Sequence, residues 1–242
     1  MRNYRVLDAF EQQYLIHRHL SSLQTLDDYS LVISPTEGRW EQSEDIARLV
    51  NKAAEEDLDL GRLAASDAPE LHALGRLTEA YRALALDENA LDFSTIQSTL
   101  LAMLREHSET LAELRTKIRY LMIDEYQDTN AIQETIVLML AAPANRICVV
   151  GDDDQSLYRF RGATVRNILE FQRNFPAGTC RKIELVTNYR SHPGIIDFYN
   201  RWMACMPPQG SWVGEEGQAY RYQKTIEPRS ASFADYASVA KV

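Results

Sequence analysis

The sequence predicts an α/β fold with a partial parallel sheet, preceded by a mostly helical segment. Three observations support this prediction. Residues 1–115 carry apolar side chains mainly at helical spacing. From residue 116 onward, short apolar runs alternate with helical segments, an order that indicates a parallel sheet. Each of these apolar runs ends in acidic, amide or arginine side chains, and ligands bind at the carboxyl ends of parallel strands.

The helical segment contains at least four predicted helices. Residues 6–23 have apolar side chains near helical spacing, and Ser43 opens a helix with acids in its first turn. A third helix is expected over residues 67–85. Residues 94–97, Ser-Thr-Ile-Gln, resemble a capping box for a fourth helix that ends near Thr116. We therefore expect a helical unit over residues 1–115.

The α/β part begins after this unit. Strands are expected at residues 120–123, 146–150 and 183–186, with helices at 132–142 and 165–175 between them. We divide this part into the later half of one domain, residues 116–182, and the incomplete start of a second, residues 183–242.

Composition excludes several classes of protein. No apolar run approaches the ~20 residues that span a bilayer, so no membrane partner is expected. Three widely spaced cysteines indicate neither a disulfide framework nor a zinc site, and a cytoplasmic location is expected. The net charge of −9 does not favour nucleic-acid binding, although residues 146–190 are locally basic.

Two acidic strand ends are candidate sites for phosphate chemistry. Asp124 could hold Mg²⁺, and the neighbouring Glu125 could activate a water molecule. The second strand end reads Gly-Asp-Asp-Asp-Gln over residues 151–155, and Gln155 could contact a terminal phosphate. Either end could instead be a solvated acidic turn.

Two further segments carry rings beside arginines. Tyr158, Phe160 and Arg161 combine stacking faces with cations, the pattern of single-strand binding. Tyr189 and Arg190 could contact an adenine and a phosphate. The first segment also fits an amphipathic strand whose rings lie in the core.

In this order and spacing, the segments closely resemble the second, third and fourth motifs of superfamily 1 DNA helicases of the UvrD/Rep/PcrA type. These segments are Asp-Glu-Tyr-Gln-Asp-Thr-Asn at 124–130, residues 150–163 and Asn-Tyr-Arg-Ser at 188–191. Leu91-Asp-Phe resembles the segment before the second motif, and the strong match spans residues 91–200. The resemblance implies a RecA-like sheet, ATP and Mg²⁺ as cofactors, and single-stranded DNA as partner.

The resemblance also implies roles for single residues. Asp124 would hold Mg²⁺ and Glu125 would activate water. Gln155 and Arg190 would contact the γ-phosphate, and Tyr189 would lie against the adenine. The DNA contacts would be made by Tyr158, Phe160 and Arg161. Members of this family often have tryptophan where this chain has Phe160, so base stacking is expected to use a smaller face.

The sequence also departs from the family pattern. It contains no Gly-Lys dipeptide, and hence no phosphate-binding loop with its lysine. We therefore expect part of an ATP-dependent 3′-to-5′ helicase that does not turn over ATP alone and belongs with the remainder of a helicase or DNA-repair complex.

Two other functions remain open at this stage. One is a non-catalytic module that binds single-stranded DNA or a partner helicase. The other is a metal-dependent phosphoesterase built on Asp124, Asp128 and Asp152, which lacks histidine ligands at a suitable spacing.

Overall fold

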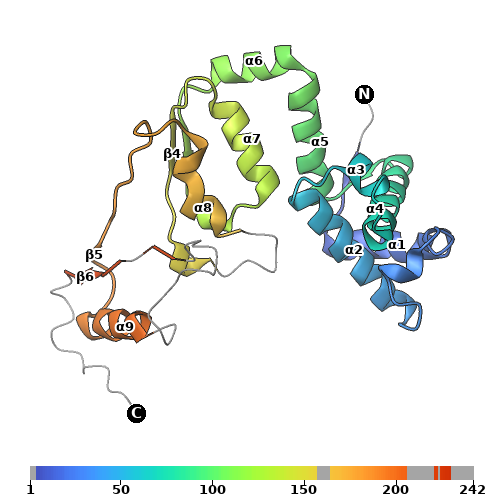
Figure 1. The fold of residues 1–242 in the computed structure, drawn as a ribbon, viewed down its shortest axis with the longest axis horizontal. Coiled ribbons are helices and arrows are strands. Elements are labelled where there is room, and N and C mark those ends of the chain that lie inside the picture. Colours follow the sequence, from blue (N-terminus) through green and yellow to red (C-terminus); the bar gives the residue numbers. More distant parts are fainter. Residues whose placement is uncertain (1–3, 157–163, 206–220, 223, 230–242) are drawn as a thin grey trace.

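A computed structural model describes residues 4–156, 164–205, 221–222 and 224–229, and Figure 1 shows its two contrasting parts. A helical bundle lies at one end, and short parallel strands with their helices make up the rest. The predicted α/β class with a helical segment is confirmed. Within the described ranges, no helix has both the length and the apolar composition to cross a membrane.

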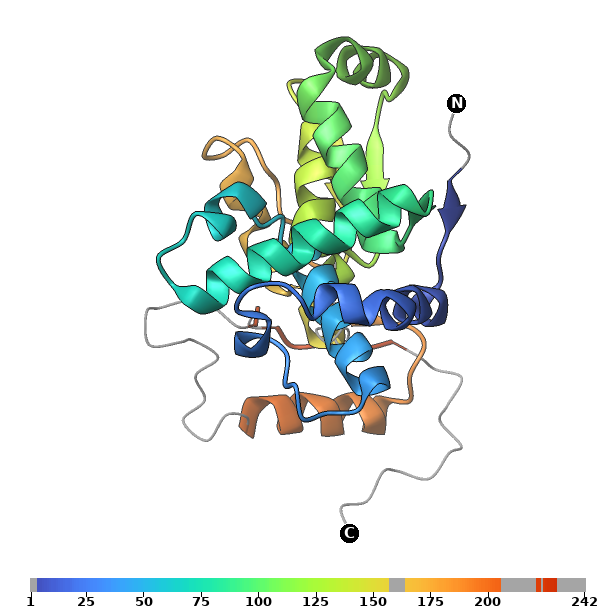
Figure 2. The ribbon, with the colours of Figure 1, turned by 90° about the vertical axis from the view of Figure 1, so that its right-hand side faces the viewer.

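The helical bundle is built around α2. Its elements are α1 (Ala9–Leu23), η1 (Tyr29–Leu31), α2 (Arg39–Glu55), α3 (Leu60–Ala64) and α4 (Pro69–Asp87). Helix α2 contacts α1, α4 and the following helix α5 (Phe93–Glu106), as the side view in Figure 2 shows. The apolar faces of α1, α2 and α4 meet in one core that includes Ile16, Leu20, Ile46, Leu77 and Tyr81.

Two short strands close the bundle. Strand β1 (Arg5–Val6) precedes α1, and β2 (Ala90–Leu91) follows α4. They pair in parallel, with Arg5 opposite Ala90 and Val6 opposite Leu91. The chain therefore enters and leaves the bundle at adjacent points.

A buried hydrogen-bond network around Asp92 joins the bundle to α5. The carboxylate of Asp92 caps α5 by accepting the Thr95 N–H at 2.8 Å and also accepts the hydroxyls of Thr95 and Tyr81. Gln12 donates to the Tyr81 hydroxyl at 3.1 Å, so α1, α4 and α5 share one network. Asp92, rather than Ser94, is therefore the cap of this helix.

A second core continues from α5 into the α/β part. The expected helix up to Thr116 is two helices, α5 and α6 (Ser108–Lys117), with His107 between them. Both pack on α7 (Ala131–Ala141) through Leu101, Leu104, Leu111, Ile132 and Ile136. This core contains residues from both sides of position 115. The division of the chain near residue 115 remains a prediction.

The central strands are β3 (Leu121–Ile123) and β4 (Ile147–Val149). They pair in parallel with Met122 opposite Cys148. One face packs on Tyr126, Ile168 and Phe171, the last two from α8 (Arg166–Glu170) and η5 (Phe171–Asn174). The other face is exposed, and Met122 has 78% of its surface accessible.

A third parallel pair lies beyond this sheet. It contains β5 (Thr187–Asn188) and β6 (Glu227–Pro228), and α9 (Pro193–Cys205) packs against it. The expected strand at 183–186 is wrong: the ladder begins at Thr187, and Leu185 is 86% exposed. In the described residues, 183–186 thus lie outside the strand, although the Val186 carbonyl at the end of this run accepts the Glu227 N–H at 2.8 Å.

Replacing Asp92 tests the buried hydrogen-bond network. We expect Asp92→Ala to lower the free energy of unfolding by about 2–4 kcal/mol, because it removes a helix cap and leaves the buried Tyr81 hydroxyl without its acceptor. Asp8→Ala is the matched control, since Asp8 caps α1 with its side chain exposed. Urea unfolding should show a loss of about 1 kcal/mol for this control. An equal loss of unfolding free energy in both variants would contradict the role of this hydrogen-bond network.

Candidate functional site

The ends of β3 and β4 are held together beyond the strand ladder. The Val150 N–H donates to the Ile123 carbonyl at 2.8 Å, and the Tyr126 N–H donates to the Val150 carbonyl at 2.9 Å. Between them, Glu125 has a left-handed backbone with φ 52°, which turns the chain into η2 (Tyr126–Asp128). The two acidic turns therefore lie side by side at one edge of the sheet.

Gln127 is the residue that links these turns. Its side chain is buried, with 1% accessible surface. Its Nε2 donates to the Glu125 carboxylate at 2.8 Å, and its Oε1 accepts the Asp152 N–H at 3.0 Å. Sequence reasoning assigned Gln127 no role. Its position inside the acidic motif was the available signal, but only the fold shows that its amide faces inward.

Asp124 and Glu125 both lie exposed at the strand end. Asp124 Oδ1 accepts the Glu125 N–H at 2.9 Å, while Oδ2 has no hydrogen bond among the described residues. In those residues, no three His, Cys, Asp or Glu side chains form a metal-binding group.

Gln155 lies at the end of η3 (Asp153–Gln155), directly after the second strand. Its Nε2 donates to Asp152 Oδ2 at 2.7 Å. Glu125, Gln127, Asp152 and Gln155 therefore form one continuous chain of hydrogen bonds. Of the sequence-predicted residues, the structure thus brings Glu125 and Gln155 into the same network.

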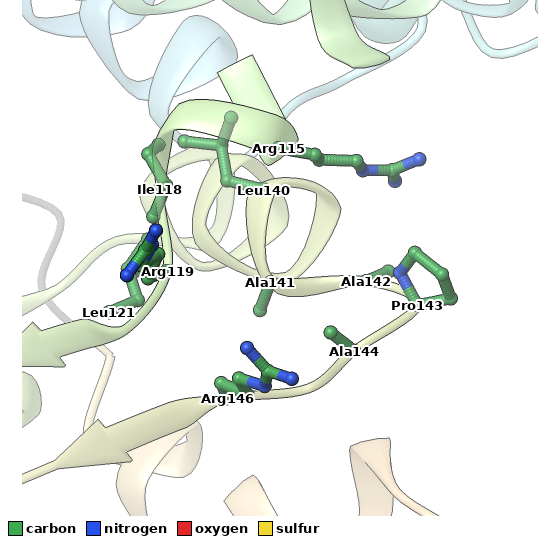
Figure 3. A pocket seen from close by; sticks show the side chains of 10 residues that line it. All are labelled: Arg115, Ile118, Arg119, Leu121, Leu140, Ala141, Ala142, Pro143, Ala144 and Arg146. Atoms are coloured by element: carbon green, nitrogen blue, oxygen red, sulfur yellow. The ribbon is translucent and has the colours of Figure 1, made fainter. Parts of the chain in front are cut away.

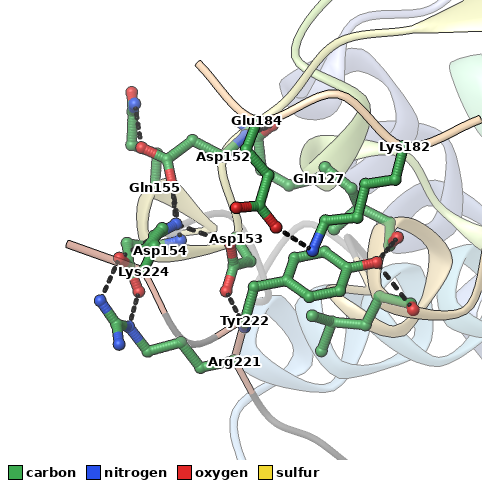
Figure 4. A network of polar contacts seen from close by, with 12 residues as sticks. Gln127, Asp152, Asp153, Asp154, Gln155, Lys182, Glu184, Arg221, Tyr222 and Lys224 are labelled. Atoms are coloured by element: carbon green, nitrogen blue, oxygen red, sulfur yellow. Dashed lines mark hydrogen bonds and ion pairs between the residues drawn. The ribbon is translucent and has the colours of Figure 1, made fainter. Parts of the chain in front are cut away.

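Asp152 also contacts a cation, as Figure 4 shows. The Lys224 ammonium forms a hydrogen bond and ion pair with Asp152 Oδ1. Burial alone raises the pKa of Asp152, but the hydrogen bonds from Lys224 and Gln155 outweigh it and hold that pKa below its usual value. Asp152 therefore remains a carboxylate that can orient Gln155.

Asp128 lies in a different environment in the same turn. Its Oδ1 is buried without a hydrogen-bond partner in the described part of the chain. Burial, and then the negative charge of Glu125, raise the pKa of Asp128. The edge thus contains carboxylates whose pKa values are shifted in opposite directions, a pattern frequent at functional sites.

Tyr189 and Arg190 follow β5, and both are exposed. Asn188 Oδ1 accepts the N–H groups of Arg190 and Ser191 at 2.9 and 2.8 Å, which fixes this turn. Among the described residues, the Arg190 side chain forms no hydrogen bond or ion pair with Glu125 or Gln155. Tyr158, Phe160 and Arg161 lie outside the described residues.

A small cavity lies at the opposite, amino ends of the strands (Figure 3). Its volume is about 70 Å³, well below the ~300 Å³ of small-molecule sites. Arg115 lines it and donates twice to the Met139 carbonyl, at 2.9 and 2.6 Å, near the end of α7. This arginine therefore satisfies a helix carbonyl, and the cavity is no candidate for a nucleotide.

Comparison with known proteins identifies the family. A model of the UvrD/REP helicase N-terminal domain matches residues 1–176. The chain belongs to the UvrD/REP helicase family. Relatives include the ATP-dependent DNA helicase PcrA of Staphylococcus epidermidis strain ATCC 35984, which is 31% identical over 221 residues. PcrA of Staphylococcus aureus strain Mu50 is 33% identical over 172 residues.

The two PcrA matches cover most of this chain but a small part of each UvrD/REP relative. They include 89% and 69% of this chain. The chain spans only 28% and 23% of the length of these curated relatives. The family resemblance seen in the sequence motifs is confirmed.

Gly151 provides a test of the edge geometry. A Cβ at this position would lie 2.5 Å from Gln127 Oε1 and 2.7 Å from Ile168 Cδ1. We expect Gly151→Ala to displace Gln127 and to cost about 1–3 kcal/mol of unfolding free energy. Gly61→Ala is the control, because its Cβ would meet only Asp59 Oδ1 at 3.3 Å, and it should change stability by less than about 1 kcal/mol. Equal stabilities in denaturant titrations would show that the glycine is not needed here.

Proposed function

We propose that this chain supplies the ATP-hydrolysing edge and the single-strand contacts of an ATP-dependent DNA helicase that moves 3′ to 5′. The observation that carries this proposal is the hydrogen-bond chain from Glu125 through Gln127 and Asp152 to Gln155. It supports the proposal because Glu125 and Gln155 belong to one hydrogen-bonded network at the carboxyl ends of parallel strands, where ligands bind. Membership of the UvrD/REP family supports the same function.

In this proposal each residue has one role. Glu125 accepts the proton of the attacking water, and Gln127 holds its carboxylate. Gln155 contacts the γ-phosphate. Tyr189 stacks on the adenine, and Arg190 reaches the same phosphate from the second α/β unit. The exposure of Tyr189 and Arg190 is compatible with contacts to a ligand.

The residues at the edge fit Mg²⁺ as a cofactor. Mg²⁺ prefers hard oxygen ligands and keeps several waters, so one or two carboxylates and the nucleotide phosphates suffice. Asp124 offers an exposed carboxylate with one oxygen that accepts no hydrogen bond in the described residues. When bound there, the ion would neutralise charge on the phosphates.

The DNA contact is proposed for Tyr158, Phe160 and Arg161, on sequence grounds alone. Two rings and a guanidinium suit stacked bases and phosphates. The partner beyond DNA is proposed to be the remainder of a helicase or a DNA-repair complex. The 242 residues contain no Gly-Lys dipeptide, so we propose that this polypeptide alone does not turn over ATP.

A chimera tests the proposed catalytic role. The matched segment, 89% of this chain, would replace its counterpart in Staphylococcus epidermidis PcrA, and DNA-stimulated ATP hydrolysis would be measured. We expect Glu125→Gln to lower kcat by about 10²–10⁴, because it removes the base. Glu109→Gln, an exposed acid in the first turn of α6, is the control and should have no effect. An active chimera that tolerates Glu125→Gln would contradict the assignment, and the 242-residue chain alone should be inactive.

DNA binding by the 242-residue chain tests the second half of the proposal. We expect Phe160→Ala to weaken binding to single-stranded DNA by about 5- to 150-fold, the value of one stacked base. Phe93→Ala removes an exposed ring at the start of α5 and serves as control. Fluorescence anisotropy with and without ATP and Mg²⁺ gives the affinities. Loss of affinity in both variants alike would contradict a specific contact. Binding that is indifferent to nucleotide in the chimera as well would favour a non-catalytic DNA-binding module.

A further inference from the structure

Three adjacent carboxylates contact two cations that lie 67 to 72 positions later in the chain. Lys224 Nζ contacts Asp152, lies 2.7 Å from Asp153 Oδ1 and lies 3.1 Å from Asp154 Oδ2. Arg221 donates to both oxygens of Asp154, at 2.6 and 3.0 Å. The Asp153 and Arg221 side chains are only 3% and 7% exposed. Cations offset the mutual repulsion of these three adjacent carboxylates, of which Asp152 is the most exposed, at 33% of its side chain.

The segment that carries these cations is anchored at further points. The Tyr222 N–H donates to Asp153 Oδ2 at 2.7 Å, and its hydroxyl donates to the carbonyls of Ile168 and Leu169 at 3.0 and 2.9 Å. The Tyr199 hydroxyl, from α9, donates to Asp154. The contacts therefore tie α9 and the residues before β6 to η3 and α8.

The same cluster is continuous with the proposed catalytic edge. Lys224 holds one oxygen of Asp152, and the other oxygen accepts Gln155. The backbone N–H of Asp152 donates to Gln127, which in turn holds Glu125. Three successive contacts thus connect Lys224 to the candidate base Glu125, through Asp152 and Gln127.

We propose that Lys224, assisted by Arg221, is a positioning residue that sets Gln155 and Glu125 through Asp152 and couples them to the β5–α9–β6 unit. The positioning role rests on the proposed function, but the structural coupling does not require it. We name Asp152, Asp153, Asp154, Arg221 and Lys224 the ionic clasp. Because the unit it holds carries Tyr189 and Arg190, the clasp links the two sides of the proposed nucleotide site.

Titration of the Asp152 carboxyl carbon by NMR in the 242-residue chain tests the clasp directly. The native chain should show an Asp152 pKa below the ordinary value. Lys224→Met should raise this pKa, because the cation and its hydrogen bond are lost while burial and the hydrogen bond from Gln155 remain. Lys224→Arg should keep it low, and Lys117→Met, which removes an exposed partner of Glu113, should leave it unchanged. An unchanged Asp152 pKa in Lys224→Met would overturn the proposal.

Amide hydrogen exchange tests the coupling to the second unit. We expect exchange in β5 and α9 to quicken at least about tenfold in Lys224→Met, while α1 and α2 stay unchanged. Asp154→Asn is a second, isosteric variant for the case that Lys224→Met unfolds the chain, and it should quicken α9 selectively. Exchange that is unchanged, or that quickens equally in every element of both variants, would overturn the coupling.

The outcomes separate this inference from the proposed function. Neither measurement contains nucleotide or DNA, so a failed clasp leaves the role of Glu125 in the chimera untouched. Conversely, the Asp152 pKa in the 242-residue chain could respond to Lys224→Met as expected while the active chimera tolerates Glu125→Gln. That result would support the clasp and reject the catalytic role.

Discussion

The candidate site depends on one buried amide, the side chain of Gln127. An amide can donate and accept at once, and here it donates to Glu125 and accepts from the backbone of Asp152. A buried amide without partners would be costly, so each acidic turn stabilises the position of the other. The arrangement converts two separate strand ends into a single edge whose carboxylates and amides have fixed relative positions.

This constraint extends to the residues around it. Gly151 has no side chain because Gln127 and Ile168 occupy the space where a Cβ would lie. Tyr126 is fully buried between the sheet and α8, and its hydroxyl donates to Glu134 at 3.1 Å. The left-handed backbone at Glu125 then leaves its carboxylate exposed, as is Asp124 before it, while Tyr126 and Gln127 after it are buried. Packing thus orients the acidic side chains toward solvent, where a ligand could meet them.

Periodicity and motif spacing predicted much of the fold but few of the side-chain hydrogen bonds and ion pairs within it. Strands near 121 and 147, and the helix over α7, follow from apolar runs between turn residues. The break at His107 and the cap at Asp92 were not predicted. Asp92 was missed as the cap because its carboxylate is held by a buried hydrogen bond from Tyr81, which lies on another helix. Lys224 could not be found from sequence at all, since its partners lie some 70 positions away and no local pattern marks them.

The distribution of charge bears on how DNA would be held. The stretch from 146 to 190 is locally basic in sequence, yet Arg166 and Arg173 both pair with Glu170, and Lys182 pairs with Glu184. These pairs are exposed or partly exposed and cost little to break, but each leaves a carboxylate beside the cation, which lowers the local net positive charge available to phosphates. For a chain of net charge −9, the proposed contact with DNA therefore depends more on stacked rings than on released counterions, which implies a shallow dependence of affinity on salt.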